Sequence, residues 1–135
     1  MRLYPLLLLL VSNSSSIRPV IAAAAAGAPV TMLIAYPATP VFNSTYYLAN
    51  HVPAVAAAWA PYGLTGYRAL QSQTAAGSAG DPYVMVFEAE WPDMDAVNDM
   101  LTQTPAEEKQ RFEEDEKRFT DKAPVVWFMG VGAQG

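Results

Sequence analysis

Hydrophobic positions from Val30 onward first follow the pattern of a strand, and further along the chain the period of a helix. Two apolar runs, 30–36 and 125–131, are typical of strands that are covered on both faces. Apolar residues alternate with other types over 83–91, which predicts the clearest strand, and a further strand is predicted over 64–70. Four strands are therefore expected, with helical segments between them.

The segment after the first strand has the apolar spacing of a helix. Its predicted inward stripe consists of Leu48, Val52, Val55 and Trp59. Asn43 or Ser44 can cap the start of this helix. Pro53 lacks the amide that would bond to the Ala49 carbonyl, so we expect a bend that leaves this carbonyl free.

A second helical region is predicted between the third and fourth strands. Asp93 is a candidate cap for a helix in which Met94, Val97 and Leu101 point inward. The sequence TPAE at 104–107 predicts a capping box that starts another helix. In that helix Phe112 and Phe119 are the inward anchors, and a solvated face accounts for Glu113, Glu114 and Glu116.

The predicted order of elements is β-α-β-β-α-β, which defines an α+β, ferredoxin-like fold: an antiparallel four-stranded sheet with helices on one face. Because 30–36 and 125–131 are apolar on both sides, the face without helices also needs a cover. A second copy of the chain, packed sheet on sheet, is the simplest cover. The sequence therefore predicts a homodimer.

Composition narrows the picture further. The chain has 135 residues, 52% of them hydrophobic and 16% charged, enough for one core. It has no cysteine and one histidine, which argues against disulfide scaffolds and multi-histidine metal cages, so no metal site is expected. The net charge of −5, with no basic patch, argues against nucleic acid as a partner.

The amino-terminal segment has the features of a leader. Leucines at 6–10 follow Met1-Arg2, and small residues at 22–27 offer cleavage sites. The apolar stretch is too short to span a bilayer. We therefore expect 1–28 to be a signal peptide or a disordered leader, ahead of one domain at 29–135. The protein is then secreted or exported, or cytoplasmic if the leader is not a signal.

Several stretches of this domain resemble the EthD family. They are YYLANHVP at 46–53, YGLTGY at 62–67, 83–91 and 115–121, and the resemblance runs from about Val30 to Val131. It implies a dimeric α+β barrel. The family is associated with ether-degrading oxidation systems, and similar domains act as decarboxylases, dehydratases or cyclases in polyketide tailoring. The resemblance also implies a role for Asp115, although Arg118 stands where the family usually has asparagine.

His51 is the main candidate for catalysis, because histidine is the side chain whose ordinary pKa lies near neutrality. Tyr47 lies four residues earlier, so both rings emerge on the same side of the helix. The alternative is a structural histidine bonded to the carbonyl that Pro53 leaves free. Catalytic candidates beside His51 are Tyr47, Glu88 and Asp115.

Candidates for substrate binding come from the strands. Glu88 and Glu90 share a face of the third strand that points into the expected barrel, unless they lie at the strand end in solvent. Arg68 can pair with either acid or with an acidic substrate. Tyr36 and Tyr67 can line a pocket for a flat aromatic ligand.

Three function classes follow from these residues. The first is a cofactor-independent enzyme that transfers protons on an apolar or aromatic, polyketide-like molecule, with His51 as acid or base. The second is an oxidoreductase, either a haem-binding barrel with His51 as axial ligand or a cofactor-free oxygenase. The third is a binding or accessory protein without catalysis.

Overall fold

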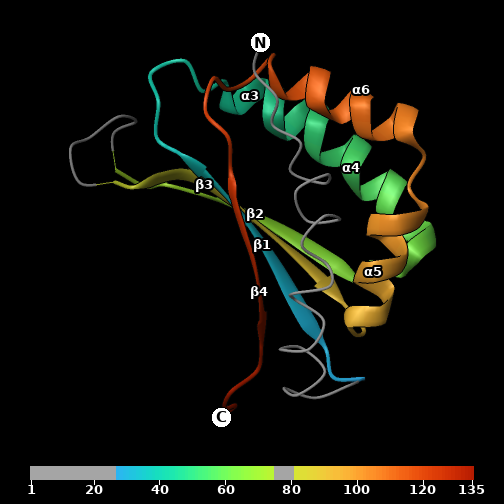
Figure 1. Ribbon diagram of the computed structural model, residues 1–135. Helices are drawn as coiled ribbons and strands as arrows, with labels where there is room; N and C mark the ends of the chain where they lie inside the picture. The colour runs from blue at the N-terminus through green and yellow to red at the C-terminus, as the bar shows by residue number, and fades with distance from the viewer. Residues whose placement is uncertain (1–26, 75–80) are drawn as a thin grey trace.

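The computed structural model describes residues 27–74 and 81–135, and these form one four-stranded antiparallel sheet with helices on one face (Figure 1). The strands are β1 (Val30–Pro37), β2 (Gly66–Gln71), β3 (Tyr83–Trp91) and β4 (Val125–Gly130). Their order across the sheet is β2-β3-β1-β4. The predicted ferredoxin-like architecture is confirmed, and the strands lie within two residues of their predicted positions.

The helical segments lie in the two crossovers. They are α3 (Ser44–Tyr46), the π-helical turn η1 (Tyr47–His51), α4 (Val52–Trp59), the 3₁₀ turn η2 (Ala60–Tyr62), α5 (Met94–Gln103) and α6 (Ala106–Glu116). In Figure 1, α4 and α6 lie side by side over the sheet. Asn43 caps α3 and Asp93 caps α5 through their side chains, as the sequence predicts. Gly63 follows η2 at a left-handed φ of 109°, which favours glycine.

The two faces of the sheet differ in how they are covered. Met32, Ile34 and Tyr36 of β1 point under the helices and belong to the buried core. The opposite face of the sheet carries an apolar set from β1, β2, β3 and β4: Leu33, Leu70, Val86, Val125, Trp127 and Met129. Val125 and Met129 are 46% and 53% exposed. We call these six residues the open face.

The predicted inward stripe of the first helix is partly wrong. Val52, Val55 and Trp59 are buried as expected, but Leu48 is 41% exposed and Tyr47 is buried in its place. The reason is the π turn, in which the Val52 amide donates to the Tyr47 carbonyl, five residues back. One extra residue in the turn shifts the inward face by one position.

The predicted capping box before α6 is wrong. Pro105 is the N-cap residue and makes no side-chain cap bond. The Thr104 hydroxyl donates instead to the Met100 carbonyl at the end of α5. Thr104 therefore closes the preceding helix rather than starting the next one.

The predicted leader, 1–28, lies almost entirely outside the described residues. Among the residues that the structure describes, no helix is long and apolar enough to cross a membrane.

Candidate active site

A pocket lies between the sheet and the helices, in the middle of the fold. Its floor comes from β1 and β3, through Met32, Ile34, Tyr36 and Phe87, and its walls come from the helices η1, α4 and α6. It leaves about 50 Å³ for the centres of water-sized molecules. That is room for several waters or one small ring. The open face lies on the other side of the sheet and contributes no residue to this lining.

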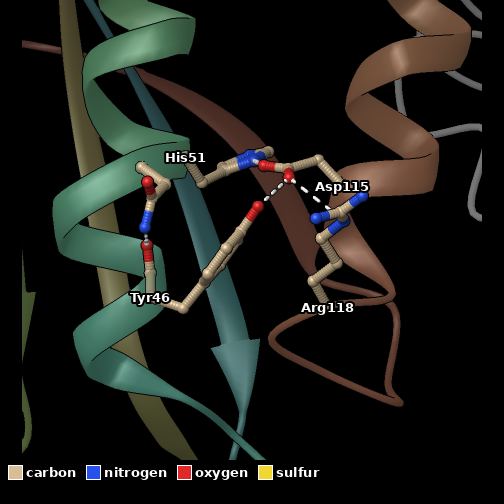
Figure 2. Close-up of polar contacts among 5 residues, drawn as sticks. Tyr46, His51, Asp115 and Arg118 are labelled. Atoms are coloured by element: carbon tan, nitrogen blue, oxygen red, sulfur yellow. Dashed lines mark hydrogen bonds and ion pairs between the residues drawn. The ribbon is translucent and has the colours of Figure 1, made fainter.

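His51 and Asp115 meet at the wall of this pocket. His51 ends η1, and its Nδ1 lies 2.8 Å from Oδ2 of Asp115 on α6. The Tyr46 hydroxyl donates to Oδ1 of the same carboxylate, and Arg118 Nε lies 4.0 Å from that oxygen. Figure 2 shows Tyr46 and His51 pointing from one helical segment toward Asp115 on the other. The aspartate is therefore held from both sides.

The charges of this pair follow from burial and hydrogen bonding. Partial burial acts to raise the pKa of Asp115, but the hydrogen bonds from Tyr46 and His51 outweigh it, so the net pKa is lowered. Burial lowers the pKa of His51, against the opposing effect of Asp115. At neutral pH the site thus holds a carboxylate and a neutral imidazole. The carboxylate accepts from Nδ1–H, which leaves the lone pair on Nε2.

His51 is buried in the wall of the pocket. Its side chain is only 9% exposed, and its ring stacks on Tyr47 at 5.6 Å and lies 4.7 Å from the Phe119 ring. The predicted alternative, a bond to the Ala49 carbonyl, is not found, because Nδ1 bonds to Asp115. The π turn explains the burial, since it brings both Tyr47 and His51 onto the inward face.

Two predicted residues, Tyr36 and Tyr47, lie together at the pocket. Their rings meet edge to face at 5.2 Å, and both side chains are buried. Burial raises the pKa of both, so both stay protonated. They therefore offer the pocket neutral hydroxyl groups.

Four other predicted site residues lie away from the pocket. Arg68 Nε donates to Glu88 Oε1 at 3.0 Å on the face of the sheet without helices. Glu90 lies on the same face and is exposed. Tyr67 is 45% exposed and stacks on Phe87 at 5.6 Å. Phe87 lines the pocket, but Tyr67 does not. The structure thus brings His51, Asp115, Tyr36 and Tyr47 together, but not these four.

Glu116 is a pocket residue, whereas the sequence predicts it on a solvated face. It is 6% exposed and lines the pocket. Burial, with Glu113 nearby, raises the pKa of Glu116 to about 8. Its spacing of four residues from Phe112 and three from Phe119 is a helical stripe, and this signal could have placed it inward.

The oxidoreductase alternative that uses haem can be tested against the pocket. Nε2 of His51 could serve as an axial ligand, because Nδ1 is held by Asp115. A porphyrin, however, has four pyrrole rings, and the pocket leaves about 50 Å³ for the centres of water-sized molecules, which is room for several waters or one small ring. The residues present therefore do not fit this group. Among the described residues, no group of three or more acidic, histidine or cysteine side chains is placed to hold a metal ion.

Comparisons with known proteins agree with the ferredoxin-like class of fold. An EthD-like protein from Ralstonia eutropha JMP134 is 21% identical with a TM-score of 0.63, covering 80% of this chain and 96% of its own. An EthD (ethyl tert-butyl ether D) family protein from Bacillus halodurans C-125 is 13% identical with a TM-score of 0.56, over 76% and 98% of the two chains. A dimeric ferredoxin-like protein of unknown function from Thermobifida fusca YX is 10% identical with a TM-score of 0.52, over 78% and 92%.

These neighbours include the family that the sequence resembles. Solved EthD proteins share the fold of this chain, as the resemblance predicts. No protein-family model matches the chain. No curated protein matches it at a significant level either.

Proposed function

We propose that this protein is a cofactor-independent enzyme that moves protons on a small apolar or aromatic molecule held in the pocket. The observation that carries the proposal is the His51–Asp115 pair, joined at 2.8 Å on the wall of a mainly apolar pocket. A neutral imidazole oriented by a carboxylate is a general base. The sequence resemblance to a family with decarboxylases, dehydratases and cyclases supports the same class of reaction.

The proposed step needs no redox partner. Nε2 of His51 takes a proton from an acidic C–H or O–H bond of the ligand, and the bonding electron pair stays on the ligand. The imidazolium that forms is stabilised by the Asp115 carboxylate. Return of this proton, or of one exchanged with solvent at Nε2, to the same or another position of the ligand regenerates the neutral histidine and a neutral ligand.

Deuterium exchange tests this step without knowledge of the natural substrate. Acetophenone has one small ring and an acidic methyl group next to a carbonyl, so it suits the size of the pocket. In D₂O the wild type should accelerate exchange of the methyl protons, followed by NMR. His51→Ala should lower the exchange rate by about 10²-fold or more, the usual contribution of a positioned base. Asn50→Ala is a matched control, because Asn50 is an exposed neighbour whose side-chain amide donates to the Tyr46 carbonyl.

A binding protein without catalysis is the second candidate, favoured by the mostly apolar lining of the pocket. It predicts that acetophenone binds and shifts NMR signals of pocket residues, while methyl exchange stays at the rate of the buffer. Exchange that is equal in wild type and His51→Ala would contradict the proton-transfer proposal. Mass spectrometry of co-purified small molecules would then identify the ligand.

We also propose that the protein is a homodimer joined through the open face. The support is the apolar set on that face, including Val125 and Met129, which are about half exposed in one chain. A patch of this kind is typical of an interface. The Thermobifida fusca protein with the same fold is described as dimeric.

A further inference from the structure

The pocket holds a carboxyl group that the proposed proton transfer does not use. Glu116 is 94% buried, given its exposed fraction of 6%. Its Oε1 has no hydrogen-bond partner among the residues that the structure describes. A buried polar atom without a partner is rare in folded proteins and destabilises the protein unless water or a ligand satisfies it. Because Glu116 also lines the pocket, a ligand can reach it.

Among the residues 27–74 and 81–135, no cation forms an ion pair with this carboxyl group. Lys109 lines the same pocket, but its Nζ donates to the Leu101 carbonyl at 2.9 Å. Glu113, one turn earlier on α6, adds a further negative charge near Glu116. The protonated form is therefore favoured, and the pKa of about 8 keeps Glu116 mostly neutral at pH 7. A neutral carboxyl group has an O–H and can donate a hydrogen bond.

A second unpaired donor lines the pocket. Trp59 is 3% exposed, and its Nε1–H has no acceptor among the described residues. Two donors without partners in one apolar pocket fit a ligand that brings an acceptor oxygen. An anionic ligand would lose hydration and meet Glu113, which also lines the pocket, so a neutral oxygen is preferred.

We propose that Glu116 donates a hydrogen bond to the carbonyl oxygen of a neutral ligand, and so selects ketones over hydrocarbons and carboxylates of the same shape. This inference rests on the proposed function for the identity of the pocket. In proton transfer next to a carbonyl, the same bond would stabilise the negative charge that develops on the oxygen. Glu116, on α6, would then contact the reacting carbonyl group, while His51, on η1, takes the proton from the ligand.

Binding of three probes, without turnover, tests this inference. The probes are acetophenone, ethylbenzene, which has CH₂ in place of the carbonyl, and benzoate. Their affinities are measured by NMR titration of the wild type at pH 7. We expect acetophenone to bind about 10-fold more tightly than ethylbenzene, as one buried hydrogen bond allows, and benzoate to bind more weakly than acetophenone.

Two variants and one control separate recognition from folding. Glu116→Leu should bring the acetophenone to ethylbenzene ratio close to one, while ethylbenzene still binds and reports a folded pocket. Glu116→Gln keeps an N–H donor and should retain the preference. Glu114→Gln is the matched control, since Glu114 lies two residues away on α6 with its side chain 62% exposed and paired with Lys117.

The pH dependence gives an independent readout. Acetophenone affinity in the wild type should fall as pH rises through about 8, because Glu116 then loses its proton. The charged or titratable groups that face it are Glu113 and Lys109 on α6, His51 and Tyr47 on η1, and Tyr36 on β1. Glu116→Gln shares all of these groups, so its affinity should stay constant over the same range.

Four outcomes would overturn the inference. They are a wild-type ratio near one, a ratio unchanged in Glu116→Leu, affinity that does not fall above pH 8, and no binding of acetophenone at millimolar concentration. The proposed function has a separate test: acetophenone that binds through Glu116 but shows no His51-dependent exchange contradicts proton transfer and leaves the recognition role standing.

Discussion

Asp115 and His51 shift each other's pKa in opposite directions: the carboxylate raises the pKa of His51, and His51 lowers the pKa of Asp115. Burial lowers the pKa of His51, and the Asp115 carboxylate works against that effect. Removal of the Asp115 charge should therefore lower the pKa of His51 further. The imidazole of an Asp115→Asn variant would be a weaker base, held by a neutral partner that no longer stabilises its charged form.

His51 is the only histidine in the sequence, so its ring signals in NMR are unambiguous. We expect the wild-type ring to titrate with a midpoint below 6.5, the ordinary value, and the Asp115→Asn ring to titrate lower still. Arg118→Gln is the control, because Arg118 is 70% exposed and lies 4.0 Å from the carboxylate, where solvent screens its charge. A midpoint that rises in Asp115→Asn would contradict the assigned roles.

At the scale of elements, the π turn η1 determines which side chains reach the pocket. A regular α-helix through 44–59 would turn Leu48 inward, as the spacing of apolar residues predicts. With the π turn, Tyr47 is 1% exposed and Leu48 is 41% exposed. Pro53 follows directly, and its missing amide and bulky ring disfavour a regular helix at this point.

Stability measurements can decide between the two versions of this helix. Tyr47→Ala should lower the free energy of unfolding by about 3–5 kcal/mol, as expected for a large buried aromatic residue. Leu48→Ala should lower it by less than about 1 kcal/mol, because the side chain is already partly in water. Urea unfolding of both variants beside the wild type gives the comparison. A larger loss for Leu48→Ala than for Tyr47→Ala would favour the regular helix.

The strands could be predicted from the sequence because each follows a local pattern, either a run of apolar residues or an alternation along the strand. β3 lies at its predicted residues, and Asp93 and Asn43 cap as their side chains suggest. The burial of His51 and Glu116 could not be read in the same way. His51 depends on a π turn, which breaks the helical period, and Glu116 depends on the packing of α6 against η1. Charged residues on both sides of Glu116 also hide its inward position.

Arg68, Glu88 and Glu90 show where sequence reasoning fails for a different reason. Alternation along β3 correctly puts both glutamates on one face, but it does not say which face holds the pocket. The pocket lies on the face with Phe87, under the helices. The ion pair of Arg68 with Glu88 instead belongs to the face that we propose as the dimer interface.

In the whole molecule, the pocket and the proposed dimer interface lie on opposite faces of the sheet. The helix-covered face holds the pocket, which is lined by residues of β1, β3, η1, α4 and α6. The open face lies across the sheet and contributes no residue to the pocket. Dimer formation and ligand binding should therefore respond to different substitutions.

Charged substitutions on the open face test both statements together. The wild type should scatter light as twice the mass of the mature chain, and the double variant Val125→Glu, Met129→Glu should scatter as one chain. These side chains are 46% and 53% exposed in one chain, so the glutamates reach water in a monomer but would lie unpaired and buried in a dimer. Val41→Glu is the control, since Val41 is 56% exposed in the loop after β1, away from the strands.

The monomeric variant should still bind acetophenone with wild-type affinity, because the pocket lies on the other side of the sheet. A wild type that scatters as a monomer would contradict the homodimer, and loss of binding with dimerisation would show that the pocket depends on the partner chain.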